Sequence, residues 1–146
     1  MWLDDREVML DEIVLTCTHL ERDYLSLLKL TEEPMLTHLF TELANQHGDW
    51  AEQLESHIRE MGELPSELDP ERQAVEELIT YAKAALSSHE RHTILKNQKE
   101  KEEKLKLLAR GLLKQKTPDS TQFLLRYIEK GVEKNQSRLL AARFRS

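Results

Sequence analysis

The sequence predicts an all-α fold, an up-down four-helix bundle with a helical crossover between the second and the third long helix. Apolar residues recur every three or four positions along most of the 146 residues, which is the periodicity of amphipathic helices. No stretch shows the strict alternation of apolar and polar residues that is typical of strands. Two of the three connections between long helices are short, so the long helices are expected to pair as antiparallel hairpins. Residues 1–146 are therefore expected to form a single domain.

The apolar periodicity places long helices over four segments: residues 5–29, 33–61, 90–115 and from 119 onward. The turn from Thr31 to Pro34 combines a residue that can cap a helix with a proline that the first helical turn tolerates. The longer connection carries two prolines between residues 62 and 70, and a shorter helix is expected over residues 71–86. In the fourth long helix, the inward stripe is expected to consist of Leu124, Tyr127, Ile128, Val132, Leu139 and Ala142.

One histidine interrupts the apolar face of the second long helix. Between Leu39 and Met61 the apolar residues fall at helical steps, and His47 lies in the middle of that stripe. A bundle helix buries its apolar stripe, so this imidazole is expected to face the core. Polar residues recur at the same level of the other inward stripes: Glu21, Glu102, and Asn135 or Gln136.

Charge is divided unequally along the chain. Residues 1–70 hold four Lys/Arg and 17 Asp/Glu, a net of −13, whereas residues 71–146 hold 17 Lys/Arg and ten Asp/Glu, a net of +7. The simplest expectation is that an acidic half packs beside a basic half, within one chain or across a homodimer. The lysine-rich helix over residues 90–115 also suggests nucleic acid, but Glu100, Glu102 and Glu103 interrupt the lysines and the segment has no aromatic residue to stack on bases. Nucleic acid is therefore the less favoured partner.

Other features bear on the compartment of the protein. The first residues are acidic, where an export signal needs basic residues before an apolar run. No run approaches the ~18 apolar residues of a membrane span. The single cysteine, Cys17, excludes an internal disulfide and suits a reducing compartment. These features predict a cytoplasmic protein with no membrane partner.

Two groups of residues resemble the ferritin-like and rubrerythrin-like superfamily. The first group comprises Phe40-Thr-Glu-Leu-Ala44 and Trp50-Ala51 in the second long helix, and Gly62-Glu-Leu-Pro65 directly after it. The second group is Glu21-Arg-Asp-Tyr24 in the first helix, which is similar to the superfamily's Glu with a nearby Tyr. The resemblance is closest to a bacterial branch of ferritin-like domains of unknown function. It implies a ferritin-like bundle, and members with intact sites bind two metal ions through one Glu from each of two helices and a Glu-x-x-His pair from each of the other two.

The sequence departs from that ligand pattern. No Glu-x-x-His occurs, and the superfamily's Glu and His positions in the second helix hold His47 and Trp50. The fourth helix has no histidine, and its candidate ligand positions hold Glu133 and Gln136. The resemblance therefore implies a degenerate di-metal site. A reduced site that holds one iron, manganese or zinc ion among Glu21, His47 and Glu102 stays open as an alternative, beside a purely hydrogen-bonded polar core.

Three functions follow from these observations. The first is a non-enzymatic ferritin-like bundle without cofactor or catalytic residues, which acts through protein–protein contacts, as a homodimer and with a protein partner that the sequence does not name. The second is a metal-binding or redox protein that uses the reduced site. The third is a nucleic-acid binder that uses the basic face. The first is the preferred hypothesis because the metal ligands of the superfamily are missing.

Overall fold

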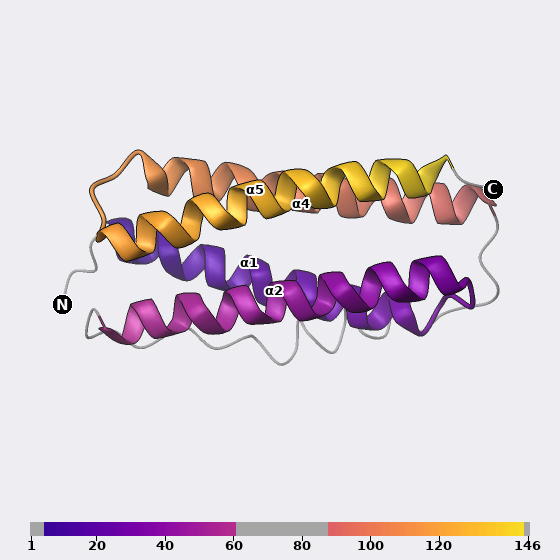
Figure 1. The fold of residues 1–146 in the computed structure, drawn as a ribbon, viewed down its shortest axis with the longest axis horizontal. Helices are drawn as coiled ribbons and strands as arrows, with labels where there is room; N and C mark the ends of the chain where they lie inside the picture. Colours follow the sequence, from indigo (N-terminus) through magenta and orange to yellow (C-terminus); the bar gives the residue numbers. More distant parts are fainter. Residues whose placement is uncertain (1–4, 61–87, 145–146) are drawn as a thin grey trace.

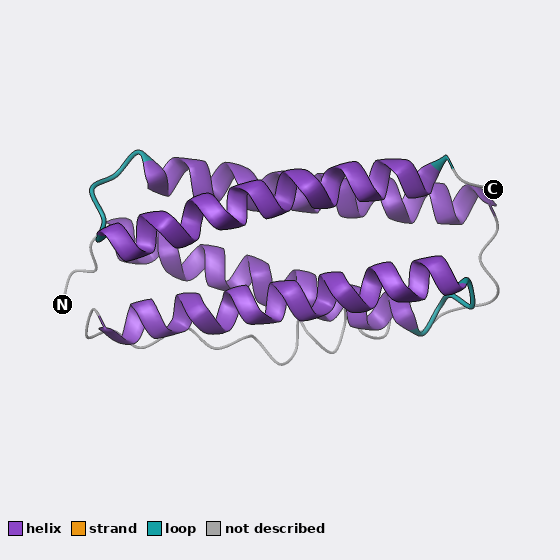
Figure 2. Ribbon diagram, viewed as in Figure 1, coloured by secondary structure: helices purple, strands orange, loops and turns teal. Residues whose placement is uncertain are grey.

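Four long helices make up the fold in a computed structural model that describes residues 5–60 and 88–144. They are α1 (Asp5–Leu28), α2 (Pro34–Glu60), α4 (Ser88–Leu113) and α5 (Asp119–Arg143). All regular structure in the described residues is helical, which confirms the all-α four-helix bundle (Figure 2). The predicted crossover, with its prolines and its helix over residues 71–86, lies outside the described residues.

The helices form two antiparallel hairpins, α1 with α2 and α4 with α5 (Figure 1). In the bundle α1 packs on α4 and α2 packs on α5, so α2 and α4 lie diagonally across from each other. Figure 1 shows that α2 and α4 run in the same direction, and that α2 ends at the opposite end of the bundle from the start of α4. Each pair of neighbouring helices is therefore antiparallel, and each diagonal pair is parallel.

Local signals set the helix ends close to their predicted positions. The Thr31 hydroxyl accepts a hydrogen bond from the Glu33 amide at 3.2 Å, and the Glu33 carbonyl accepts one from the Thr37 amide at 2.9 Å. Helix α2 then begins at Pro34, whose missing N–H is one of those that a first turn leaves unbonded anyway. Helix α5 begins after Pro118, whose carbonyl accepts from the Gln122 amide at 3.0 Å.

Large side chains from all four helices fill the centre of the bundle. From α1, α2 and α4, the largest that are fully buried are Trp50, Tyr24, Phe40, Leu10, Ile13, Leu20, Leu36, Leu43, Leu54, Leu95, Leu105 and Leu112, and α5 adds the fully buried Leu125, Ile128 and Leu139. The inward stripe predicted for the fourth helix is wrong at Tyr127, which is 60% exposed, while Leu125 is fully buried. Leu125, Val132 and Leu139 recur every seven residues and define the centre of the stripe, so Tyr127 lies outside it.

A glycine on α5 receives the largest core side chain. A Cβ atom built on Gly131 would lie 2.5 Å from Cζ2 of the Trp50 ring, closer than atoms can approach. Gly131 therefore lets the indole of α2 lie against the backbone of α5. Gly48 and Gly111 also lie within helices, but the nearest atoms to their Cβ positions belong to flexible side chains, those of Glu21 and Met9.

Ion pairs join the acidic hairpin α1–α2 to the basic hairpin α4–α5. The pairs Asp23–Lys101, Glu33–Arg91 and Glu42–Arg138 cross between the hairpins. Exposed pairs of this kind contribute only about 0–1 kcal/mol each, so they orient the hairpins more than they stabilise them. Part of the charge difference between the two halves is thus neutralised within one chain. Within the described part of the chain, no helix has both the length and the apolar character that crossing a membrane would require.

Candidate functional site

Glu102, in the middle of α4, is a charged side chain with no exposed surface. Three side chains from three other helices surround its carboxylate. The Tyr24 hydroxyl of α1 donates to Oε2 at 3.0 Å, and Asn135 Nδ2 of α5 donates to Oε1 at 3.0 Å. His47 Nε2 of α2 lies 2.6 Å from Oε2 and 3.0 Å from Oε1. Each helix of the bundle thus contributes one side chain to a single buried cluster.

His47 has both ring nitrogens engaged. Its Nδ1 lies 2.6 Å from the Leu43 carbonyl oxygen, which can only accept, so Nδ1 carries a hydrogen and donates. The ring is fully buried, and the Leu43 bond fixes its orientation so that Nε2 faces Glu102. Because Tyr24 and Asn135 also donate to Glu102, its carboxyl group is the shared acceptor of the cluster.

Aromatic rings surround the polar groups. The Tyr24 ring lies 5.4 Å from the His47 ring and 5.9 Å from Phe40, and the Trp50 ring meets His47 edge-on at 4.9 Å between centroids. Burial raises the pKa of Tyr24 well above its ordinary value, and the adjacent Glu102 raises it further. The Tyr24 hydroxyl is therefore a hydrogen-bond donor at any physiological pH.

Two glutamines and an asparagine complete the cluster. Asn135 Nδ2 also donates to Gln46 Oε1 at 2.7 Å, which links the buried cluster to the α2–α5 contact. Gln98, one turn before Glu102 on α4, is only 4% exposed. Its side-chain amide lies near the Tyr24 hydroxyl and opposes the rise in that pKa, yet Nε2 has no acceptor with hydrogen-bond geometry in the part of the chain that the structure describes. The hydrogen bonding of this amide is thus incomplete.

Cys17 is fully buried and close enough to the cluster to sense its charge. Burial raises the pKa of its thiol far above the ordinary range, and the negative charge of Glu102 acts in the same direction. Because the thiolate is the nucleophilic form of cysteine, this side chain is a core residue with little reactivity.

The structure brings together two of the three predicted metal-site residues. His47 and Glu102 are in contact, but Glu21 lies to one side, with its carboxylate against the backbone of Gly48, where a Cβ atom would come within 2.2 Å of Oε2. Burial raises the pKa of Glu21 and the neighbouring Asp49 adds to that rise, while Arg22 and His47 oppose it. Across residues 5–60 and 88–144, no three His, Cys, Asp or Glu side chains gather as a metal ion would require.

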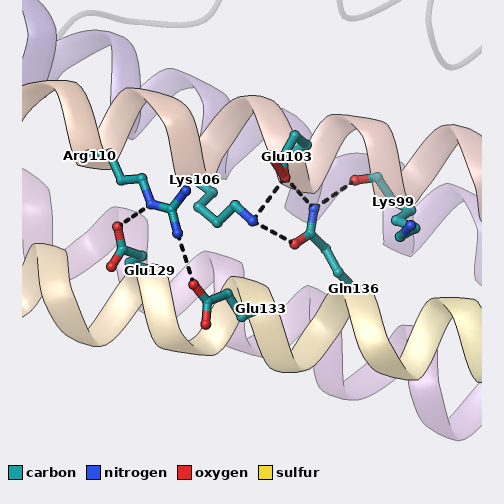
Figure 3. Close-up of polar contacts among 7 residues, drawn as sticks. All are labelled: Lys99, Glu103, Lys106, Arg110, Glu129, Glu133 and Gln136. Carbon is teal, nitrogen blue, oxygen red and sulfur yellow. Dashed lines mark hydrogen bonds and ion pairs between the residues drawn. The ribbon is translucent and has the colours of Figure 1, made fainter.

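The candidate ligand positions of the fourth helix point away from the core. Figure 3 shows Glu133 and Gln136 in a surface network between α4 and α5. Arg110 donates to Glu129 at 2.7 Å and to Glu133 at 3.0 Å, while Gln136 donates to Glu103 at 2.7 Å and accepts from Lys106 at 3.2 Å. The pKa of Glu103 is lowered by its hydrogen bond from Gln136, then by that from Lys106.

Asn135, not Gln136, is thus the residue that reaches the cluster. Sequence reasoning misses Gln98, although its signal is present: it occupies the α4 stripe one turn from Glu102 and one turn from Leu95, where an apolar residue would be expected. It also misses the Tyr24 hydroxyl as a partner of Glu102, because the resemblance relates Tyr24 only to Glu21 and its helical spacing places it among the apolar residues of the first helix.

The model of a family described as a domain of unknown function (DUF2383) matches residues 7–115, which include α1, α2 and α4 and exclude α5. No curated protein and no solved structure matches the chain.

Proposed function

Because this chain belongs to the DUF2383 family, whose function is unknown, its own residues must indicate a role, and we propose that it is a non-enzymatic, ferritin-like helical bundle that acts through protein–protein contacts. In this proposal the place of a di-metal site is taken by the cluster of Tyr24, His47, Glu102 and Asn135. The bundle is then a rigid support for its outer surfaces.

The hydrogen bonding of Glu102 carries this proposal. Both oxygens of its carboxylate accept from protein donors, and His47, whose imidazole contacts it, is engaged at both nitrogens. A metal ion would have to displace at least one of these bonds, and the loss of a buried, charge-assisted hydrogen bond costs about 1.5–3 kcal/mol. The indole of Trp50 fills further space beside His47.

The path of the chain supports the ferritin-like part of the proposal. Helices α2 and α4 are parallel, and the end of α2 and the start of α4 lie at opposite ends of the bundle (Figure 1). A four-helix bundle with one long crossover has this arrangement, and ferritin-like folds are of that kind.

The outer surface supports action through protein contacts. Large apolar side chains are exposed on α5, with Phe123 at 74%, Tyr127 at 60% and Leu140 at 39%. Aromatic residues on a surface are typical of the centres of protein interfaces.

A metal measurement tests the proposal. Protein purified without chelators is analysed for iron, manganese and zinc, then titrated with each ion. We expect far less than one ion per chain and no saturable tight binding. The proposal is overturned by one tightly bound ion per chain that is lost in His47→Ala and kept in His38→Ala, a control in which the replaced imidazole is 74% exposed.

The reduced metal site is the second candidate, and the contact of His47 with Glu102, two of its three proposed residues, is the observation that favours it. The nucleic-acid candidate is weaker, because Lys101, Lys106 and Arg110 of the basic face of α4 are engaged in ion pairs with carboxylates of the same chain.

A further inference from the structure

An exposed stripe of α5 carries aromatic and basic residues and no acidic residue. Phe123, Tyr127, Lys130 and Lys134 recur every three or four positions and are all exposed; we call them the α5 stripe. The two rings, one helical turn apart, are 74% and 60% exposed. Neither lysine forms an ion pair within residues 5–60 and 88–144. Scattered exposed apolar residues are ordinary, but two adjacent rings beside two such cations form a patch that suits an acidic partner.

An exposed stripe of α2 is acidic and entirely polar. Glu42, Asp49, Gln53 and Glu60 recur at helical spacing and are all exposed; we call them the α2 stripe. Glu42 pairs with Arg138 of α5 at the boundary between the two helices, and the side chains of this pair remain 44% and 33% exposed. Asp49 forms no ion pair in the described segments.

The two stripes lie side by side on one face of the bundle. Helices α2 and α5 are packed neighbours, joined by Trp50 against Gly131 and by Gln46 with Asn135 (Figure 1, where both helices face the viewer). Because the helices are antiparallel, these two contacts place Asp49 at the level between Lys130 and Lys134 along the bundle axis. The same face therefore carries a cationic strip and an anionic strip at equal heights.

We propose that this face binds a second copy of the chain, with the α5 stripe of each copy lying on the α2 stripe of the other. A two-fold axis parallel to the helices keeps every residue at its own height, so Asp49 of one copy comes between Lys130 and Lys134 of the other, twice in the dimer. The rings of Phe123 and Tyr127 then cover the α2 surface around Gln53. Packing α5 on α5 would oppose lysine to lysine, and packing α2 on α2 would oppose acid to acid.

The size of the face is sufficient for a specific dimer. A helix of 25 residues such as α5 is roughly 37 Å long, and two helices side by side are roughly 20 Å wide. The face thus offers about 700 Å² per copy, close to the ~800 Å² per partner of standard interfaces. This inference rests on the proposed action through protein contacts and names its surface and partner.

Charge reversal tests the pairing. One variant carries Lys130→Glu with Lys134→Glu, the other carries Asp49→Lys; all three residues are exposed, and circular dichroism confirms folding. Sedimentation equilibrium up to ~1 mM protein should show a wild-type dimer. Each variant alone opposes like charges at two symmetric contacts, so its dissociation constant should rise about tenfold to thirtyfold.

Mixing the two variants 1:1 provides the rescue. In the mixed dimer the lysine introduced into one variant meets the two glutamates introduced into the other, while the second symmetric contact keeps its native pair. Dimerisation should therefore return to within about threefold of wild type.

Replacement of the rings tests the apolar part of the contact. Phe123→Ser with Tyr127→Ser should weaken the dimer about tenfold or more, whereas Leu107→Ser, which removes a 56% exposed residue from α4, should leave it unchanged. A wild-type monomer at all concentrations, a dimer indifferent to the two reversals, or a mixture that fails to recover would each overturn the inference. None of these outcomes changes the result expected from the metal measurement. Failure of the proposed dimer contact is therefore distinguishable from failure of the proposed function.

Discussion

Breaking the buried His47–Glu102 pair from one side should cost more than removing the pair altogether. In His47→Leu, the buried Glu102 carboxyl group loses the imidazole that contacts it inside the bundle, and removing one member of a buried ion pair costs about 3–5 kcal/mol. Glu102→Gln keeps an oxygen that can accept from Tyr24 or Asn135 but removes the charge, and the lost charge-assisted bonds are worth about 1.5–3 kcal/mol. In the double variant neither member of the pair remains charged, so it should lie only about 1–2 kcal/mol below wild type.

Urea unfolding measures this cycle. Far-UV circular dichroism follows the helices, and the fluorescence of Trp50, whose ring lies 4.9 Å from that of His47, follows the core. The two single losses sum to roughly 6 kcal/mol and the double variant loses only about 1–2 kcal/mol, so the coupling energy should be about 4–5 kcal/mol, well above the ~0.5 kcal/mol error of additivity. With ~2–4 °C per kcal/mol for a chain of this size, His47→Leu should lower the Tm by about 10 °C. His38→Leu, at an exposed site, should change stability by less than ~0.5 kcal/mol. Strictly additive losses, or a loss below ~1 kcal/mol in His47→Leu, would refute the coupled pair.

Two further predictions concern Gly131 and Glu21. Gly131→Ala should destabilise the bundle despite the ~1 kcal/mol gain in helix propensity, because the added Cβ meets the rigid Trp50 ring at 2.5 Å. Gly111→Ala should be neutral or stabilising, because its Cβ meets only the flexible end of the Met9 side chain at 3.3 Å. Equal shifts of the melting temperature in the two variants would contradict this prediction. Burial is the largest cause of the raised pKa of Glu21. The stability that this side chain contributes is therefore present below its pKa in the unfolded chain, and it is lost as the pH rises through its pKa in the folded protein. Glu21→Gln should therefore gain stability relative to wild type between about pH 4 and pH 7, and a difference that is constant over that range in urea unfolding would exclude a raised pKa.

The polar centre of the bundle is largely predictable from the sequence, because a polar residue in an apolar helical stripe must face the core. This rule identifies His47 and Glu102, and they are in contact. The rule fails at the edge of a stripe, where a small rotation decides whether a side chain turns inward. Glu21 lies at such an edge and turns toward Gly48, and the choice between Asn135 and Gln136 depends on a rotation of about 100° that periodicity does not resolve.

The misplacement of Tyr127 has a related reason. Its ring is large and apolar, which favours a place in the stripe, but Leu125 already fills the inward position at that height. The error is informative, since an aromatic residue that the core has no room for becomes available at the surface. Partner choice across the bundle, such as which carboxylate Arg138 meets, depends on the relative rotation of two helices and lies beyond single-helix periodicity.

The seating of Trp50 on Gly131 determines more than a local contact. If one hairpin slid along the other by a helical turn, about 5.4 Å, the indole would face a residue with a Cβ atom, such as Tyr127 or Asn135, in place of the glycine. The same slide would separate Tyr24 and His47 from Glu102 and leave a buried carboxylate short of hydrogen-bond partners. Bundles with uniformly apolar cores can exchange between neighbouring offsets of similar energy. Here the fit of Trp50 against Gly131 and the hydrogen bonds of Glu102 both oppose the same displacement, so this pair of hairpins has one axial alignment.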